Sequence, residues 1–501
     1  MKHIRIVAAL LAMLMLASSF TACGVTTDDP AVTSPGSTSS AETELETELV
    51  DWLPDDLHYG GDKITVISRY REGWTSGEIA VKELLSEPVN DAVYERNKAV
   101  EERLGVEIVS IEENNNNPDV VVNKVATAVK SGTHEYDVMA AACYTSVNQS
   151  INGTFVDLRQ TEWLDFDKPW WSAGFNEVIE YNGAQYAVTG DMVLSLYRFA
   201  FVTVFNKNIF TDANQKHLYD YVQEGTWTLD KQIELVPLFH QDNGNAQQDK
   251  EGDVYGLVSN DYISVDPYWS SCMVDIIKKN SDGDYEIVFD TDKLHGVCEK
   301  TLRLFYECGD ATYNFKHEGL DDEQAYIRDM FAQSYAAMAT VRILELEAGS
   351  IRSMEDEFGV VPMPKYDEAQ NGYRTLLHDQ FTVMCVPTTI QTNRLDEVSA
   401  VLEAMASTSY KTVRPAYYET TLRTKIAQDP QSAEMFDIII DNIYIDAGII
   451  YTSSLPGFQG SFRALVNSKQ NDAVSRFTAL NKQARNKLKG IIRKLDNLAI
   501  Q

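Results

Sequence analysis

Two periods of apolar and polar positions alternate along the chain after residue 60. Lys63–Ser68 is a β-branched run between glycines and polar residues, which is typical of a strand. Apolar side chains three or four positions apart predict helices over 89–104 and 120–129. Strands are predicted at Val106–Val109 and Tyr136–Ala140. This order of strand, helix, strand, helix and strand predicts a parallel sheet with helical crossovers.

Later segments show fewer patterns that predict secondary structure, but these patterns are longer. Tyr197–Asn206 and Leu376–Val386 are long β-rich runs, and the second is expected to cross between domains. Asn182-Gly183 predicts a hairpin turn. Residues 471–500 form one amphipathic pattern, which predicts a C-terminal helix. In the predicted parallel sheet, ligands are expected beyond the carboxyl ends of the strands, near residues 69–74 and 141–144.

The N-terminus has the form of a secretory signal. Lys2 and Arg5 precede an apolar run of 11 residues, Ile6–Leu16, and small residues follow it. A run of that length is too short to cross a bilayer as a helix. Residues 1–22 are therefore expected to be a signal peptide that is absent from the mature protein.

The residues after the apolar run resemble the lipobox of bacterial lipoproteins. The segment Phe20-Thr21-Ala22-Cys23 places a cysteine after a small residue, and the resemblance implies that palmitate-type acyl chains modify Cys23. The alternative is an ordinary signal peptide. Thr, Ser, Pro, Asp and Glu dominate the following segment, so residues 23–52 are expected to be the lipid-anchor cysteine and a flexible linker.

Composition excludes several classes of function. The 501 residues include 43 Lys and Arg against 75 Asp and Glu, which gives a formal net charge of −32. This charge argues against binding to nucleic acid and against electrostatic docking on an anionic membrane. The length predicts two or three domains. Besides Cys23 there are five cysteines without a CxxC pair, which favours buried thiols over a zinc site or a disulfide framework.

No common catalytic motif stands out. The chain has no GxSxG, HExxH or GxxxxGK[ST] motif, and no GxGxxG follows a strand. Its eight histidines make no i, i+4 pair, so neither a metal nor a cofactor is expected. Two carboxylates for glycoside hydrolysis cannot be chosen among so many acidic residues. A secreted, lipid-anchored glycoside hydrolase therefore remains the enzymatic alternative.

Several segments in this order resemble family 1 extracellular solute-binding proteins, the lipoprotein receptors of bacterial ATP-driven importers. Together with the lipobox they span nearly the whole mature chain, and their order and spacing carry the resemblance. The segments are NDAVYERNKAVEERLGVEI from Asn90, YDVMAA from Tyr136, DLRQTEWLDFDKPWW from Asp157, YNGAQYAVTGD from Tyr181, FNKNIF from Phe205, EGTWTLDK from Glu224, GDVYGL from Gly252 and FGVVPMPKYDEAQNGY from Phe358.

The resemblance implies an α/β fold of the type II periplasmic-binding-protein kind, with two lobes, a cleft between them and strand crossovers as the hinge. Lobe 1 is expected to comprise residues 53–200 with 380–415, and lobe 2 residues 201–379 with 416–501. The implied protein is a monomeric receptor on the extracellular face of the cell membrane. It binds a small solute, most of all a carbohydrate or oligosaccharide, and delivers it to an ABC import permease. A peptide or another small solute, and signalling without transport, remain alternatives.

A sugar receptor needs planar hydrogen-bonding groups and flat aromatic faces in its cleft. Residues of these kinds at strand ends and loops are candidates for ligand binding, although each could also be a core or turn residue. The candidates are Tyr70, Trp74, Tyr144, Asp191, Tyr268, Trp269, Arg342 and Asp379.

Overall fold

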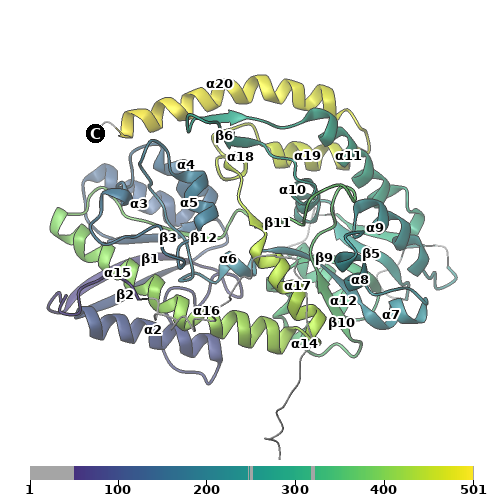
Figure 1. Ribbon diagram of the computed structural model, residues 1–501, viewed down its shortest axis with the longest axis horizontal. Coiled ribbons are helices and arrows are strands. Elements are labelled where there is room, and N and C mark those ends of the chain that lie inside the picture. Colours follow the sequence, from purple (N-terminus) through teal and green to yellow (C-terminus); the bar gives the residue numbers. More distant parts are fainter. Residues whose placement is uncertain (1–49, 246, 249–251, 317–321, 500–501) are drawn as a thin grey trace, which may run out of the picture. The chain divides into compact units, whose positions relative to one another are not determined.

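Two mixed β-sheets organise the chain, and each one is the centre of a lobe (Figure 1). The computed structural model describes residues 50–245, 247–248, 252–316 and 322–499. The first sheet has the order β12–β3–β1–β2, in which β1 pairs in parallel with β2 and β3, and β12 is antiparallel to β3. Its strands are β1 (Asp62–Tyr70), β2 (Val106–Asn114), β3 (Val138–Ala142) and β12 (Thr382–Cys385).

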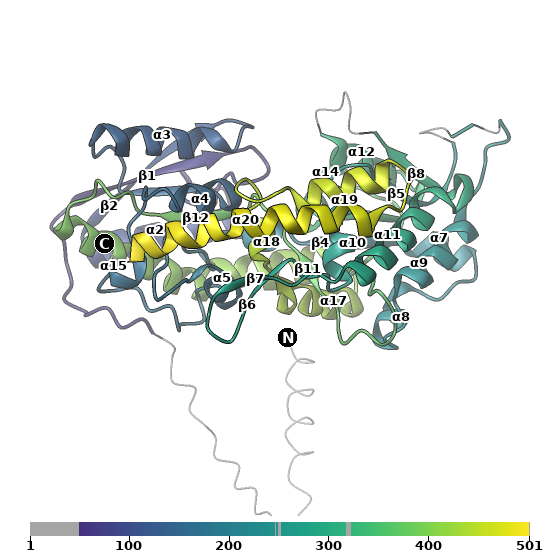
Figure 2. The same ribbon diagram turned by 90° about the horizontal axis from the view of Figure 1, so that it is seen from above.

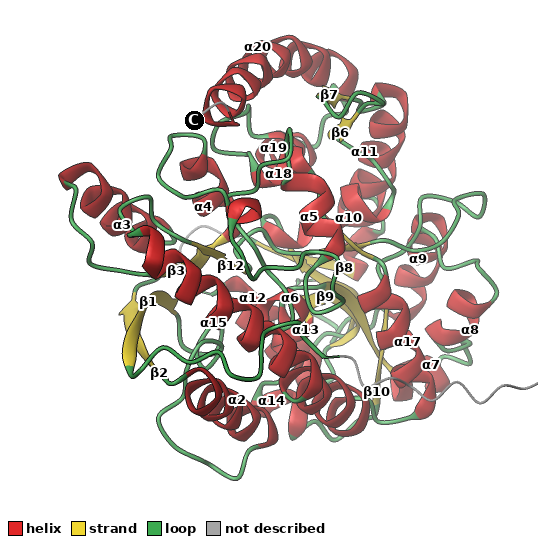
Figure 3. Ribbon diagram, turned by 60° about the vertical axis from the view of Figure 1, so that its left-hand side comes forward, coloured by secondary structure: helices red, strands yellow, loops and turns green. Residues whose placement is uncertain are grey.

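Helices cover both faces of the first sheet (Figure 3). One face carries α3 and α4, and the other carries α2 and α15. This burial on two sides explains why β3 is inaccessible at every position. The helices of this lobe are α2 (Pro88–Leu104), α3 (Asp119–Ser131), α4 (Cys143–Ser150), the 3₁₀ turn η1 (Leu158–Gln160), α5 (Ala173–Ile179) and α15 (Thr392–Lys411).

The second sheet has five strands in the order β10–β4–β9–β5–β8. Strands β5, β8 and β9 run parallel, whereas β4 is antiparallel to both β9 and β10. The central strands β4, β5 and β9 are buried along their whole length. The five strands are β4 (Phe201–Asn206), β5 (Tyr255–Asn260), β8 (Thr312–Phe315), β9 (Ala336–Arg342) and β10 (Phe358–Val361).

The second lobe is completed by short helices, and α12 packs against β9 and β5. The remaining elements of this lobe are α7 (Lys207–Asp212), α8 (Leu218–Gln223), α9 (Leu229–Leu235), η2 (Val236–Phe239), η3 (Ile263–Val265), α10 (Asp266–Ser271), α11 (Thr291–Tyr306), η4 (Gly309–Ala311), α12 (Glu323–Ala332), α13 (Ile343–Leu346), α14 (Gly349–Arg352) and α17 (Pro430–Asp441). Two small pairs accompany them, β6 (Ile277–Lys279) with β7 (Tyr285–Ile287), and β11 (Thr375–Leu376) with β13 (Ile443–Tyr444).

Local sequence signals set several boundaries. Gly105 ends α2 with a left-handed conformation at φ 61°, which glycine adopts without strain. The predicted turn at Asn182-Gly183 is confirmed, because both residues have positive φ and Tyr181 pairs with Ala184.

Before its C-terminal segment, the described part of the chain crosses between the lobes three times. The first two crossings lie side by side, because Ala200 bridges Leu377 and the amide of His378 donates to the Phe199 carbonyl at 2.9 Å. The strand predicted from Tyr197 begins only at Phe201, since the preceding residues form the short helix α6 (Ser195–Arg198) at this crossing. The third crossing consists of α16 (Val413–Pro415) and a π-helix, η5 (Ala416–Ile426).

The C-terminal segment contacts both lobes. It contains α18 (Ala447–Ile450), α19 (Phe458–Asn467) and α20 (Ala473–Ala499), and α20 runs along both lobes (Figures 1 and 2). Near its C-terminal end, Lys494 Nζ donates to Asn152 Oδ1 at 2.9 Å, and Asp496 accepts from Asn182 at 3.1 Å. The resemblance implies that residues 416–501 belong to lobe 2, and these bonds join the end of that segment to residues of lobe 1 as well.

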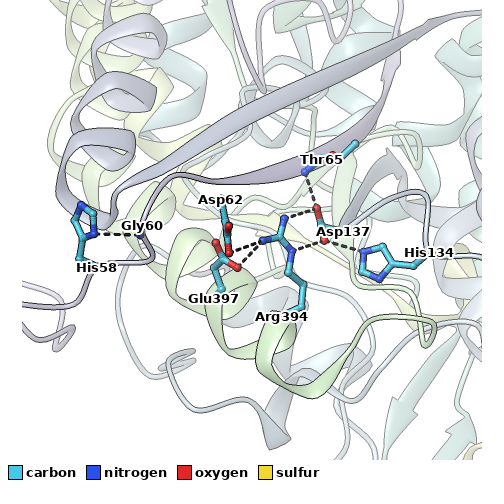
Figure 4. Close-up of polar contacts among 8 residues, drawn as sticks. All are labelled: His58, Gly60, Asp62, Thr65, His134, Asp137, Arg394 and Glu397. Atoms are coloured by element: carbon cyan, nitrogen blue, oxygen red, sulfur yellow. Dashed lines mark hydrogen bonds and ion pairs between the residues drawn. The ribbon is translucent and has the colours of Figure 1, made fainter.

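An ion-pair network fixes the amino ends of the first sheet (Figure 4). Arg394 of α15 donates to both carboxylate oxygens of Asp137, at 2.9 and 3.1 Å, and Asp137 also accepts from the Thr65 amide at 2.7 Å. Burial would raise the pKa of Asp137, but the hydrogen bonds from Arg394, Thr65 and His134 outweigh it and lower that pKa. The ionised carboxylate therefore holds β1, β3 and α15 together.

We expect Asp137→Asn to lower the free energy of unfolding by about 2–3 kcal/mol at pH 7, because charge-assisted hydrogen bonds are lost. The pKa of Asp137 is lowered in the folded state, so its contribution is present above the ordinary aspartate pKa and is lost as pH falls through the folded value. Urea unfolding at pH 7 and pH 3 should show a smaller difference between variant and wild type at pH 3. Glu107→Gln is the control, because its exposed pair with Lys63 should contribute less than about 1 kcal/mol. An equal loss at both pH values would contradict the assignment.

The predicted signal peptide at 1–22, Cys23, and most of the 23–52 linker lie outside the described residues. None of the described helices combines the length and the apolar character that crossing a bilayer requires. Within the described chain, Cys143, Cys272, Cys298, Cys308 and Cys385 are free thiols, and all five are buried, as predicted.

Candidate ligand-binding site

Residues from both lobes and from the first two crossings meet beyond the carboxyl ends of the parallel strands. Trp74, in the loop after β1, contacts the crossing residues Phe199 and His378, with ring centroids 5.4 and 5.7 Å apart. Phe199 and His378 also contact each other at 5.8 Å. This is the location where open α/β sheets bind their ligands.

Two guanidinium groups lie over the indole of Trp74. Arg71, from the same loop, is 3.3 Å from the ring centroid, and Arg342, at the end of β9, is 4.1 Å away. Arg342 belongs to the second lobe, so this contact joins the lobes directly. The cations occupy the π surface of Trp74, and the indole is therefore a support for arginines rather than a free platform for a sugar ring.

The loop that carries Arg71 and Trp74 is held by buried polar groups. Glu78 accepts from the amide of Ser195 at 2.5 Å and from the Thr382 hydroxyl at 2.7 Å, so one carboxylate connects the loop to the first crossing and to the start of β12. Burial raises the pKa of Glu78. On α2, the fully buried Arg96 donates to the carbonyls of Glu78 and Ile79, at 3.2 and 2.6 Å.

Tyr144 and Asp379 form the adjoining part of the site. Tyr144 lies at the start of α4, directly after β3, and its amide donates to the Asp379 carbonyl at 3.2 Å. Burial, with a contribution from the Asp379 carboxylate, raises the pKa of Tyr144 to about 12, so its hydroxyl keeps its proton at neutral pH. Burial raises the pKa of Asp379 to about 6, although Arg463 acts in the opposite direction.

Arg69 lies next to this pair with unused hydrogen-bonding capacity. Arg69 is 4% exposed, and its Nη2 donates to the Asn116 carbonyl at 3.1 Å. Within the described residues, Nε and Nη1 of Arg69 have no hydrogen-bond partner. Burial lowers the pKa of Arg69, and the nearby Tyr144, Glu78 and Asp379 partly offset this effect. Buried guanidinium donors without an acceptor are a costly arrangement that a ligand can relieve.

The second lobe contributes two arginines that already have carboxylate partners. Arg463 of α19 lies over the ring of Tyr262 at 4.3 Å and donates to both oxygens of Asp266. Arg342 donates to Glu345 through Nε and Nη2, at 3.3 and 2.6 Å. The nearby Asp379 carboxylate contributes to the raised pKa of Arg463, which places Arg463 on the same side as the Tyr144 and Asp379 pair.

We call this group the interlobe site. It combines guanidinium donors, tyrosine hydroxyls, a carboxylate and a histidine that burial and nearby arginines keep neutral by lowering its pKa. A cavity of about 290 Å³ adjoins it, and Trp74 and Glu345 are among the residues that line this cavity. No cluster of metal ligands occurs among the described residues. The members of the site are Arg69, Arg71, Trp74, Tyr144, Phe199, Tyr262, Asp266, Arg342, His378, Asp379 and Arg463.

The structure brings Trp74, Tyr144, Arg342 and Asp379 together in this site. Two other predicted residues lie elsewhere. Tyr70 points its hydroxyl at Glu72 and lines a separate cavity with the start of α2. Asp191 accepts from Tyr197 and pairs with Arg414 at 3.5 Å, beside the first and third crossings.

The prediction that Tyr268 and Trp269 contact ligand needs correction, because both side chains are in the core. Tyr268 is fully buried, and its hydroxyl is 3.2 Å from that of Thr340. Trp269 is 3% exposed, and its indole nitrogen donates to the Val274 carbonyl at 2.8 Å. Both rings follow Pro267 in the short helix α10, where they face α11, α19 and α20 rather than solvent.

Several residues of the interlobe site escaped sequence analysis. Arg69 and Arg71 follow the predicted strand Lys63–Ser68, and this position at a strand end could have identified them as candidates for ligand binding. His378 directly precedes the predicted residue Asp379, and this position could also have identified it as a candidate. No such position identifies Arg463, since its partner Asp266 is 197 residues away in the chain.

Comparison with known proteins by sequence finds no matching family model and no matching curated protein. Comparison by structure does find similar folds. A solute-binding protein of an ABC transporter from Thermotoga lettingae, solved with alpha-D-tagatose, has a TM-score of 0.54 at 14% identity, over 86% of this chain and 100% of that one. The ABC substrate-binding protein from Listeria monocytogenes, in complex with cycloalternan, has a TM-score of 0.52 at 13% identity, over 87% and 99%.

A third structure shows a different kind of ligand on the same fold. UgpB from Mycobacterium tuberculosis, in complex with glycerophosphocholine, has a TM-score of 0.53 at 16% identity, over 87% of this chain and 99% of that chain. These likenesses establish the mixed α/β, two-lobed fold of periplasmic solute-binding proteins for this chain, as the sequence predicted.

Proposed function

We propose that the chain is a lipid-anchored extracellular receptor that binds a small solute, most of all a carbohydrate, between its lobes and passes it unchanged to an ABC import permease. The observation that carries the proposal is the interlobe site itself. Trp74 of one lobe contacts Arg342 of the other, and unused donors of the buried Arg69 lie beside Tyr144 and Asp379. Such convergent polar groups between lobes are typical of a ligand site.

The carbohydrate class is supported by the ligands of proteins with this fold. The Thermotoga protein was solved with a sugar and the Listeria protein with cycloalternan. Membership in family 1 of the extracellular solute-binding proteins is part of the proposal and rests on the sequence segments described above. The same resemblance supports a permease partner and a monomeric receptor.

Ligand binding is proposed to draw the lobes together by rotation at the three crossings. A ligand shifts an open–closed equilibrium only through contacts that it makes better in the closed form. Contacts from both lobes, such as those of Tyr144 and Tyr262, would supply that difference. Small-angle scattering should show a smaller radius of gyration with a validated ligand, and an unchanged radius would contradict closure.

Anchoring on the extracellular face of the cell membrane is proposed from the signal-like residues 1–22 and from Cys23. Metabolic labelling of the producing cells with a palmitate analogue tests this part. Cys23→Ser should abolish the label, and a label that persists would overturn the anchor.

Thermal-shift screening against a glycan panel tests the receptor function, with the exported chain carrying Cys23→Ser so that no lipid attaches. A ligand that binds only the native state raises the melting temperature. Chromatography of the recovered glycan then separates a receptor from a hydrolase, because a receptor returns its ligand unchanged. Stabilisation by peptides alone, or cleavage of the glycan, would overturn the proposal.

We expect Tyr144→Ala to weaken binding of any glycan found in this screen by about tenfold or more, because an aromatic contact at the centre of the site is lost. The matched control is Tyr70→Ala, because Tyr70 is the last residue of β1 and lies outside the interlobe site. Isothermal titration of both variants measures the difference. Equal losses in the two variants would place the ligand elsewhere.

A further inference from the structure

Four arginines act electrostatically on one histidine of the interlobe site. Arg342, Arg463, Arg69 and Arg71 are all near enough to His378 to help lower its pKa, after burial itself. They come from both lobes. This concentration of positive charge contrasts with the whole chain, whose formal net charge is −32.

Two of the four arginines are neutralised within the protein. Arg342 donates to both oxygens of Glu345, and Arg463 to both oxygens of Asp266. Their charges need no further partner. Arg342 nevertheless keeps one buried nitrogen, Nη1, without an acceptor among the described residues.

Arg69 and Arg71 differ from the other two. Within the described residues, neither makes an ion pair with a carboxylate. Glu78, Asp379 and Asp119 are near Arg69, and Asp322 and Glu323 are near Arg71, and these carboxylates partly offset the effect of burial without forming an ion pair with either arginine. The neutral His378 offers no compensating charge.

The two unpaired arginines also act on each other. Burial lowers the pKa of Arg71 to about 10, and the positive charges of Arg69 and Arg342 add to that effect. The backbone amide of Arg71 donates to the Thr75 hydroxyl, and its guanidinium stacks on Trp74. Among the described residues no side-chain hydrogen bond of this guanidinium is found. A buried and a partly buried cation that lack an ion-pair partner are unfavourable next to each other until an anion joins them.

We propose that the interlobe site selects a solute with an anionic group, a carboxylate or a phosphate, and that Arg69 and Arg71 hold this group. The inference rests on the proposed function and narrows its ligand class to an acidic sugar or a sugar phosphate. Guanidinium groups bind carboxylate and phosphate oxygens in a bidentate manner. Tyr144 and Tyr262 then lie beside the anion as contacts for the rest of the solute.

Matched acidic and neutral sugars test the inference. Isothermal titration compares oligogalacturonides with galacto-oligosaccharides of the same length, and glucose 6-phosphate with glucose. At least one acidic member should bind about 10–100 times more tightly than its neutral partner, the range expected for hydrogen bonds to a charged group. A preference for oligogalacturonides would indicate that the site binds a carboxylate, and a preference for glucose 6-phosphate that it binds a phosphate.

Arginine variants locate the anion. Arg69→Gln and Arg71→Gln should each remove most of the preference for the acidic sugar. The Arg303→Gln control on α11 should retain it, because its side chain is half exposed and pairs with Asp230, which is not a member of the site. Circular dichroism and the melting temperature establish that each variant is folded. If Arg69→Gln does not fold, Arg71→Gln alone decides, since Arg71 is only partly buried. A preference that survives Arg71→Gln would overturn the assignment.

The outcomes also separate this inference from the proposed function. Binding of neutral sugars as tightly as their acidic partners would overturn the anionic ligand class and leave the carbohydrate receptor intact. Failure of every sugar, neutral and acidic, would overturn the receptor proposal and this inference with it.

Discussion

Replacing Trp269 by alanine should lower the free energy of unfolding by about 3–5 kcal/mol, the usual cost of removing a large buried aromatic side chain. The indole packs edge-on against Phe458, Phe462 and Phe477, with ring centroids 5.8 to 6.4 Å apart. It thereby joins α10 to α19 and α20. The Val274 carbonyl would also lose its hydrogen bond from the indole nitrogen.

The same variant separates a core residue from a ligand contact. Denaturant unfolding measures the stability loss, and titration at a temperature where the variant is folded measures ligand affinity. We expect an affinity within twofold of wild type. Val474→Ala is the control on α20, because Val474 is 44% exposed and should change stability by less than about 0.5 kcal/mol. A tenfold loss of affinity in the folded Trp269→Ala variant would mean that Trp269 contacts the ligand after all.

Much of the first sheet could be predicted because its signals are local. The strands β1, β2 and β3 alternate with periodic helices, and Gly105 ends α2 at the predicted position. The Tyr197 run shows the limit of this approach. Its β-branched and aromatic residues resemble a single strand, but the chain must first turn at a crossing between lobes, so Ser195–Arg198 forms a helix. The need to turn at this point comes from the position of the two lobes, and it leaves no local pattern in the amino-acid sequence.

The site could be predicted only in part, for the same reason. Trp74 and Tyr144 follow strands, and the rule that ligands bind at carboxyl ends identified them. Tyr268 and Trp269 were misinterpreted because their neighbours Asp266 and Ser270 are polar, as in a surface loop. The structure shows that Asp266 is buried with Arg463, so its charge is compensated by a distant part of the chain. Pairing over such separations is decided by tertiary packing alone.

Replacing Arg96 by methionine should lower the free energy of unfolding by about 3–5 kcal/mol, a loss typical of breaking a buried polar network. Arg96 is fully buried, and no carboxylate of the described residues pairs with it. Its guanidinium instead donates to the carbonyls of Met192, Glu78 and Ile79, at 3.1, 3.2 and 2.6 Å. Methionine fills similar space but leaves these carbonyls without donors in the interior.

The loss should extend to the ligand site. Met192 leads into the first crossing, and Glu78 belongs to the loop that carries Arg71 and Trp74, so Arg96 aligns this loop with the hinge. We therefore expect hydrogen exchange of amides in residues 71–80 to accelerate more than exchange in β5 of the other lobe. Lys98→Met on the same helix is the control, because Lys98 is exposed and its ion pair is with Glu101 on the helix surface. Uniform acceleration in both lobes would mean that Arg96 stabilises the whole fold without positioning the site.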